Sequence, residues 1–161
     1  SGSLGHRTGS VGMISVHRGD PRHPGATRLL QASHALMQAS FPAESNHYLS
    51  IDALCAPEIH FFVATEDDQI LGCGAIAEKT GYGEIKSMFT AETARGRGVA
   101  DLILTRLTDQ ARALGLPLMR LETGNTLYAA HRLYRRHGFA DRGPFGDYPD
   151  DPISLFMEKA L

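Results

Sequence analysis

The sequence predicts an α/β fold built on a mixed central sheet. Short segments rich in β-forming residues alternate with longer segments in which apolar residues recur at helical spacing. One of the short segments, IHFFVAT at 59–65, is apolar almost throughout, which is typical of a strand buried on both faces of a sheet. A chain of 161 residues is also long enough to enclose one full hydrophobic core.

The N-terminal part begins with a Gly/Ser-rich, aperiodic stretch at 1–12, which we interpret as a leader or expression remnant ahead of one domain at 13–161. A short alternating pattern then predicts a strand at 13–18. Apolar residues at helical spacing predict a helix over 26–38. The segment 41–58 is polar and contains two prolines, so we expect a loop around one short helix there.

The middle of the chain predicts three consecutive strands, joined by the turn sequences EDDQ and TGYG, at 59–65, 70–79 and 84–90. A helix is predicted from Val99 to Leu114, with Leu102 on its apolar face, and Gly115 and Pro117 then end it. The remaining elements are a strand at 118–123, a helix at 126–137 and a closing strand at 153–159.

Composition limits the classes of function. The net charge of −2 at pH 7 argues against a nucleic-acid partner, because such proteins normally carry a basic excess. The sequence has no apolar run of the roughly 18 to 20 residues that cross a bilayer, so no membrane partner is expected. Cys55 and Cys73 lack CxxC or zinc-type spacing, and no two histidines stand four residues apart. These features favour a cytoplasmic protein without a metal site.

The most informative stretch is Arg95-Gly96-Arg97-Gly98, which opens the predicted helix at Val99. The first amides of a helix have no intrahelical acceptor and favour anions, and glycines let the backbone approach an anion closely. The pattern therefore indicates a phosphate or pyrophosphate cradle. It is not a P-loop, because no lysine or hydroxyl residue follows Gly98, and it lacks the third glycine of a dinucleotide fingerprint. The alternative is an ordinary solvated helix start.

Two motifs together resemble a known family. Arg95 to Ala100 matches the Q/R-x-x-G-x-G/A signature of the GNAT-superfamily N-acetyltransferases, and AAHRLYRRHGF at 129–139 resembles the family's second signature, A-x-x-L-Y-x-x-x-G-F. The segments GCGA, GEIKSM, LETG and DPISLFMEKAL resemble a bacterial subgroup typified by YsnE. The resemblance extends from Met13 to Leu161 and implies a single-domain GNAT fold with helices on both faces of the sheet.

The resemblance implies acetyl-CoA as cosubstrate, with a strand gap that admits its thioester. The cofactor-binding residues it implies fall into two groups and one further position. Arg95, Gly96, Arg97, Gly98, Val99 and Ala100 would hold the pyrophosphate, the backbone of Met88, Phe89 and Thr90 would pair with the pantetheine arm, and Asn125 completes the set.

Acetyl transfer to an amine needs a base for the amine and a proton for the departing thiolate. Glu84 lies eleven residues before Arg95, where family members that use a carboxylate base carry theirs. The alternative is a structural carboxylate paired with Lys86 or Lys79. Glu122 on the facing strand is a competing base.

Tyr134 matches the family tyrosine that donates a proton to the sulfur, and its alternative role is a packed core aromatic. His47, Tyr48 and Glu44 are predicted acceptor contacts. The arginines of the second motif are predicted to form a solvated helix face or, alternatively, to bind the 3′-phosphate of CoA; they are Arg132, Arg135 and Arg136.

These features predict an acetyl-CoA-dependent N-acetyltransferase that acts on an amine of a small molecule or peptide by direct attack. The alternative from a different class is a non-catalytic acyl-CoA-binding regulatory module, which would need the glycine loop but neither Glu84 nor Tyr134. The sequence leaves the identity of the acceptor open, and it leaves open whether the chain forms a homodimer.

Overall fold

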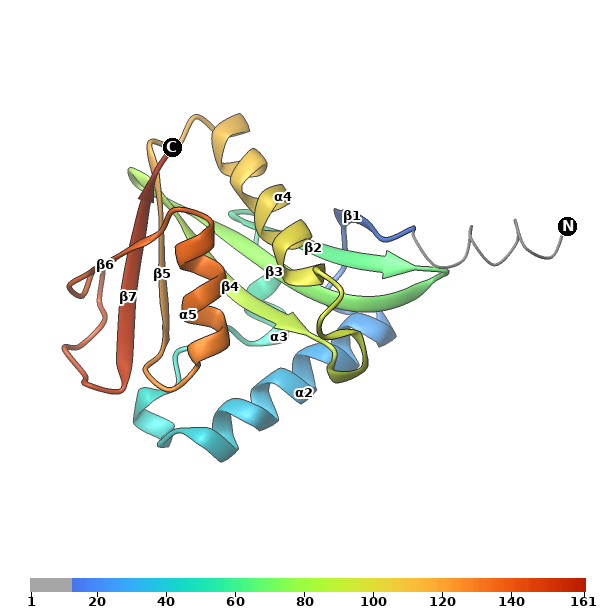
Figure 1. Ribbon diagram of the computed structural model, residues 1–161, viewed down its shortest axis with the longest axis horizontal. Helices are drawn as coiled ribbons and strands as arrows, with labels where there is room; N and C mark the ends of the chain where they lie inside the picture. Colours follow the sequence, from blue (N-terminus) through green and yellow to red (C-terminus); the bar gives the residue numbers. More distant parts are fainter. Residues whose placement is uncertain (1–12) are drawn as a thin grey trace, which may run out of the picture.

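The computed structural model describes residues 13–161, and the leader expected at 1–12 lies outside them. Within this range, seven strands form one sheet in the order β1-β2-β3-β4-β5-β7-β6. β4 and β5 run parallel and the other neighbours antiparallel, which confirms a mixed sheet (Figure 1). The strands are β1 (Ser15–Arg18), β2 (Ile59–Glu66), β3 (Gln69–Lys79), β4 (Tyr82–Thr90), β5 (Leu118–Gly124), β6 (Ala140–Arg142) and β7 (Ser154–Ala160).

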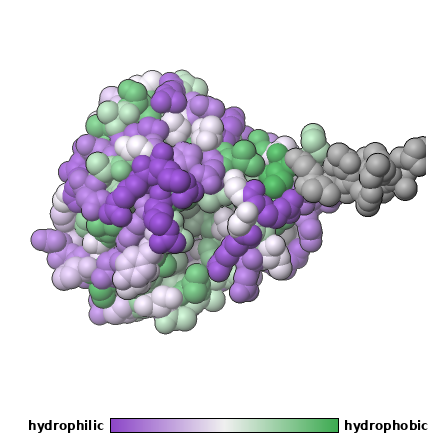
Figure 2. Space-filling model, viewed as in Figure 1, coloured by the Kyte–Doolittle hydropathy of each residue, from purple (hydrophilic) through white to green (hydrophobic). Residues whose placement is uncertain are grey.

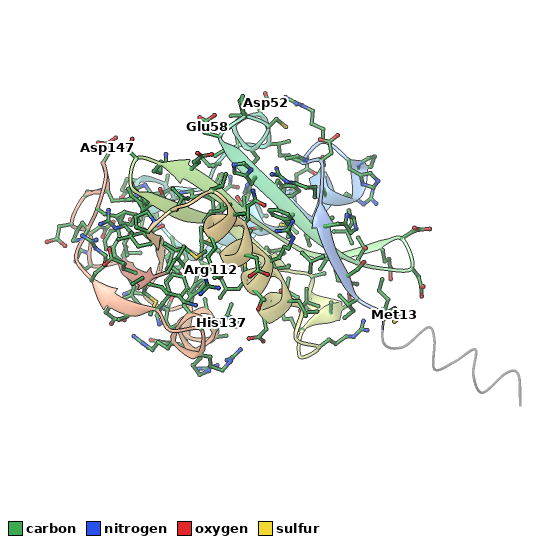
Figure 3. All side chains as sticks on the ribbon, turned by 90° about the horizontal axis from the view of Figure 1, so that it is seen from above. Met13, Asp52, Glu58, Arg112, His137 and Asp147 are labelled. Atoms are coloured by element: carbon green, nitrogen blue, oxygen red, sulfur yellow. The ribbon has the colours of Figure 1, made fainter. Side chains whose placement is uncertain are left out.

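Helices cover both faces of this sheet, as predicted. One face carries α2 (Pro24–Ser40) and α3 (Ile51–Leu54), and the other carries α4 (Val99–Ala113) and α5 (Tyr128–Arg136). In the view from above, Asp52 and Glu58 lie on one side of the sheet, and Arg112 and His137 lie on the other (Figure 3). Two short 3-10 helices complete the fold, η1 (Ala43–Ser45) and η2 (Glu92–Ala94).

Two hydrophobic clusters hold these layers together, and β2 contributes to both. Phe62 and Ala64 pack with the residues of α4, while Phe61 and Val63 pack with those of α2 and α3. Because side chains alternate along a strand, this confirms that the apolar run at 59–65 is buried on both faces. Among residues 13–161, no helix has the length and apolar character that a membrane span requires.

Some details differ from the sequence prediction. The strand β6 was not predicted, because three residues that pair with β7 are too short to show an alternating pattern. Leu102 is 43% exposed, whereas Leu104 is buried against the sheet, so the predicted apolar face of α4 was wrong at this position. Helix α2 begins earlier than expected, at Pro24, since a proline is favourable in the first turn of a helix.

The feature that matters most for function is the splay between β4 and β5. These strands pair at Gly83–Met119 and Glu84–Arg120 and then diverge (Figure 1). Near the same point the register between β3 and β4 shifts, and Ser87 adopts a left-handed backbone with φ of 57°. The sheet is therefore open in its middle, between β4, which ends the antiparallel group β1-β2-β3-β4, and β5.

Candidate active site

The loop that opens α4 has the backbone geometry of an anion cradle. Gly96 and Gly98 have φ angles of 81° and 78°, a left-handed conformation that glycine adopts at little cost. A Cβ atom added at either glycine would meet no atom within 4 Å. The N–H of Leu102 donates to Gly98 O, so the amides that precede it at the helix start have no intrahelical acceptor. This arrangement places helix-start amides without an intrahelical acceptor beside two uncrowded glycines.

The two arginines of this loop have different environments. Arg97 forms a two-pronged ion pair with Glu66 at the end of β2, with N–O distances of 2.7 and 2.9 Å. This hydrogen bonding lowers the pKa of the Glu66 carboxyl. Arg95 is exposed and lines a groove beside Phe89 and Arg28. The backbone of Arg97 thus belongs to the cradle, while its guanidinium group is directed to β2.

The face that carries α4 and α5 is hollowed between α5 and the loop before α4 (Figure 2). Hydrophilic residues gather over α5 beside this hollow (Figure 2). The C-terminal part of β4, with Met88, Phe89 and Thr90, leads to the glycine loop at the same end of the sheet. Asn125 lies beyond the end of β5, where its backbone N–H donates to Ile153 O and its side chain is exposed.

A cavity of about 140 Å³ lies where β4 and β5 diverge. Its walls come from α2, the segment 41–49 (hereafter the strap), β4, β5 and α5, and they include both Glu122 and Tyr134. Two buried polar atoms of the lining have no hydrogen-bond partner among the described residues, His47 Nε2 and Ser87 Oγ. The walls of the cavity therefore combine a carboxylate, a phenol and two buried polar atoms whose hydrogen bonding is unsatisfied.

Tyr134 is 5% exposed and packs edge-on against Phe139, which agrees with the core role that the sequence left open. It also lines the cavity. Burial raises the pKa of its phenol, and the nearby Glu122 carboxylate raises it further. The hydroxyl is consequently a proton donor at neutral pH, which is the form that a leaving thiolate requires.

Glu122 projects from β5 into the same cavity and accepts a hydrogen bond from Ser154 Oγ at 2.8 Å. Burial raises the pKa of the Glu122 carboxyl above its ordinary value. The Ser154 hydrogen bond and the electrostatic influence of His47 and Lys86 oppose this rise in the Glu122 pKa, and Glu84 adds to it. A raised pKa makes a carboxylate a stronger base, since the ideal pKa of a catalytic base lies near the working pH.

Glu84 has a different setting. Its side chain is 7% exposed, and its Oε2 accepts a hydrogen bond from Tyr148 at 2.5 Å and lies 3.6 Å from Lys86 Nζ. Glu84 lines a separate groove on the α3 side, whose rim includes Glu58 and Asp147 (Figure 3). The pairing with Lys86 is the structural alternative that the sequence had left open. No sequence signal pointed to Tyr148, which lies in the loop 143–153.

Lys86 connects the strands to the segments that cover the cavity. Its Nζ donates to Tyr148 Oη at 2.8 Å and to the backbone oxygen of His47 at 2.9 Å. Ser45 Oγ in the strap donates to Asp151 Oδ2 in the 143–153 loop at 2.6 Å. The strap and this loop therefore lie together over the opening between β4 and β5.

The start of the strap is fixed against β5. A Cβ atom at Gly124 would lie 2.3 Å from Cζ of Phe41, so the ring of Phe41 occupies the space that any other residue at 124 would need. Farther along, Tyr48 stacks on His34 with ring centroids 4.2 Å apart and accepts a hydrogen bond from Gln38. The glycine of the LETG segment is thus explained by the close approach of the strap.

The other predicted side chains have varied positions. His47 and Tyr48 line the cavity, whereas Glu44 is exposed and lies outside the lining. Arg135 pairs with Asp141 and Arg136 pairs with Asp101. These two pairs agree with the predicted solvated helix face.

Comparison with known proteins supports the family resemblance. A sequence model described as "Acetyltransferase (GNAT) family" matches residues 26–139. The chain is 47% identical over 152 residues to an "IAA acetyltransferase" of Azospirillum brasilense, a match that covers 92% of this chain and 98% of the relative. It is 42% identical over 123 residues to the "Uncharacterized N-acetyltransferase YsnE" of Bacillus subtilis (strain 168), covering 74% and 82%. The predicted likeness to YsnE is thereby confirmed.

A solved structure supports the fold in the same way. A crystal structure from Klebsiella pneumoniae subsp. pneumoniae, described as an acyl-CoA N-acyltransferase, has a TM-score of 0.78 and 29% sequence identity, and the match covers 92% of this chain and 98% of that one. The seven-stranded mixed sheet, the two signature motifs and these relatives agree with one another. The chain belongs to the GNAT family of acetyltransferases.

Proposed function

We propose that this acetyltransferase transfers an acetyl group from acetyl-CoA to an amine, with Glu122 as the general base and Tyr134 as the general acid. The observation that carries the proposal is that both side chains line one cavity at the point where β4 and β5 diverge. Acyl transfer as such follows from membership of the family. The acetyl donor, the amine acceptor and the residue roles are the proposal.

The donor is assigned to the α4–α5 side of the sheet. The backbone amides from Gly96 to Ala100 would bind the pyrophosphate, because they lie at the positive end of the α4 dipole and no atom crowds Gly96 or Gly98. Arg95 would add a positive charge beside them. The pantetheine arm would pair with the backbone of β4 from Met88 to Thr90, and this direction leads the thioester toward the cavity.

The acceptor is assigned to the opposite side, beneath the strap. Its ammonium group loses a proton to the Glu122 carboxylate, directly or through one water. The nitrogen lone pair then attacks the thioester carbonyl carbon, the carbon–sulfur bond breaks, and the Tyr134 hydroxyl gives its proton to the leaving thiolate. The acylated nitrogen still carries a surplus proton, which returns the Tyr134 phenolate to the phenol, and the proton on Glu122 passes to solvent. The products are an N-acetylated amine and CoA with a free thiol.

Glu122 is preferred over Glu84 because of what each carboxylate contacts. Tyr148 and Lys86 already occupy Oε2 of Glu84, which lines the groove on the α3 side. Glu122 lies with Tyr134 in the central cavity, and burial raises the pKa of its carboxyl. We therefore assign Glu84 a structural role that holds Lys86 and Tyr148 in place.

The cellular setting is a further part of the proposal. Cys55 and Cys73 are both free thiols, and burial raises the pKa of the Cys73 thiol to about 12. Free thiols are typical of a reducing compartment, which favours the cytoplasm.

The test is a turnover assay with acetyl-CoA and a panel of primary amines. Free thiol release is followed spectroscopically, and mass spectrometry measures the acetylated amine in the same samples. We expect thiol and acetyl-amine to appear in equal amounts with at least one amine. Binding of CoA by calorimetry without any acetylated product would instead support the non-catalytic acyl-CoA-binding module.

A further inference from the structure

The charges that face the cavity restrict the chemistry of the acceptor. Among the described residues, three ionisable side chains other than Tyr48 and Tyr134 line the cavity: His47, Lys86 and Glu122. An α-amino acid brings a carboxylate next to its amine and would need a cation to receive it. The question is therefore whether Lys86 is available for that purpose.

Lys86 is committed to protein contacts. Its side chain is 12% exposed, and its ammonium group donates to Tyr148 Oη and to His47 O while lying 3.6 Å from Glu84. Tyr148 in turn donates to Glu84 at 2.5 Å, so the carboxylate and the ammonium are linked through one phenol. The Lys86–Glu84 pair is neutral as a unit, and withdrawing Lys86 from it would leave a buried carboxylate without its counter-charge.

The charge that remains at the cavity is the carboxylate of Glu122. An ammonium group is attracted to it, whereas a second carboxylate beside that ammonium would be repelled in a site of low dielectric constant. The unpartnered His47 Nε2 and Ser87 Oγ are themselves buried in the wall of the cavity, so neither atom is presented to a carboxylate of the acceptor. The rest of the lining mixes apolar side chains, such as Met37 and Phe41, with neutral polar side chains, namely Ser33, Ser45, Asn46 and Thr123.

We propose that the natural acceptor is a primary amine with no carboxylate on the carbon next to its nitrogen. This proposal rests on the proposed transferase function. It distinguishes simple amines, and amino groups whose neighbouring carboxyl is blocked as an amide, from free α-amino acids.

The experiment uses sets of three acceptors with the same side chain. Phenethylamine, phenylalaninamide and phenylalanine form one set, and isopentylamine, leucinamide and leucine form the other. The full chain is assayed with saturating acetyl-CoA, and acetylated product is measured by mass spectrometry. In at least one set we expect kcat/KM for the amine or the amide to exceed that for the acid by more than tenfold.

A pair of variants tests the charge argument directly. Met37→Lys adds a cation to the cavity lining, and Leu36→Lys adds the same charge one residue away on α2, at a side chain that is 40% exposed. Met37→Lys should raise acid turnover relative to amine turnover by about tenfold or more, while Leu36→Lys should keep the wild-type ratio. An unchanged ratio in a folded Met37→Lys variant would contradict the charge argument.

The outcomes separate the two proposals. Acetylation of the acids at rates equal to or above those of the amines and amides would overturn the inference and leave the transferase function standing. Absence of product from all six compounds, while the protein binds acetyl-CoA, would count against both proposals together.

Discussion

The two sides of the sheet are built by different means. The proposed cofactor side consists of backbone amides from one contiguous stretch, Gly96 to Ala100. The proposed acceptor side is held together by side chains that are distant in sequence: Ser45 and Asp151 are 106 residues apart, and Tyr148 and Glu84 are 64 residues apart. A backbone site depends on local conformation, whereas a side-chain network depends on the whole fold.

This difference determines how each side should respond to mutation. On the cofactor side, a substitution matters where it changes φ or adds a Cβ atom to the cradle. On the acceptor side, removing one member of a buried network leaves its partners unsatisfied, so the effects of substitutions are coupled. The predictions below use this contrast and proceed from the largest expected effect to the smallest.

The largest effect is expected at Tyr134, which lies at the boundary between the two sides. Tyr134→Phe keeps the packed ring and removes the proton donor. We expect kcat to fall by roughly 10²–10⁴-fold with little change in acetyl-CoA affinity, because the hydroxyl acts on the leaving thiolate. Steady-state kinetics and calorimetry measure both quantities. A variant with full kcat would leave Tyr134 with its packing role alone.

Glu122→Gln should lower kcat/KM by about 10²-fold or more at pH 7. An alkyl amine with a pKa of about 10 is almost entirely protonated at this pH and needs a base. The loss should shrink as the pH rises, since the amine then deprotonates without help. In the wild type, burial raises the Glu122 pKa, so the acidic limb of the kcat/KM profile should lie above the ordinary glutamate pKa of about 4.3.

Stability provides an independent readout for Glu122. A carboxyl whose pKa is raised in the folded state contributes stability below its unfolded pKa, and this contribution is lost as the pH rises through the folded pKa. Glu122→Gln should therefore be at least as stable as the wild type at pH 8, where the wild-type carboxylate is ionised. Thermal unfolding from pH 4 to pH 8 measures this difference.

Glu84→Gln is the matched control on the neighbouring strand. It removes the counter-charge of Lys86 and replaces the carboxylate that accepts from Tyr148 with a neutral amide oxygen, so it should lower the free energy of unfolding by about 3–5 kcal/mol. The folded variant should keep an acidic limb above the ordinary glutamate pKa, because burial, the main cause of the raised Glu122 pKa, is unchanged, although the smaller contribution of the Glu84 charge is lost. If Glu84→Gln instead loses 10²-fold in kcat/KM while Glu122→Gln is active, the base is Glu84.

The contrast also explains how far the sequence could predict the site. Arg95 to Ala100 and Tyr134 belong to local motifs, so their positions near β4 and the cavity were foreseeable. The choice between Glu84 and Glu122 was not, because it depends on Tyr148 from a loop whose sequence shows only turn residues. Leu102 was misplaced for a similar reason: periodicity locates an apolar face to within about a residue, and packing against the sheet selects Leu104.

The smallest effect, and the clearest test of the cofactor side, concerns Gly98. Gly98→Ala adds a Cβ atom that points into open space in the free protein. The free variant should therefore lose stability only because alanine is unfavourable in the left-handed backbone conformation. Gly115 has nearly the same φ, 74° against 78°, with equally open space at the other end of α4. Gly115→Ala therefore reproduces the strain without touching the cradle. We expect Gly98→Ala to weaken CoA binding by about tenfold, which is 1.4 kcal/mol, while Gly115→Ala binds as the wild type does. Equal dissociation constants for the two folded variants, measured by calorimetry, would show that the pyrophosphate does not rest on this loop.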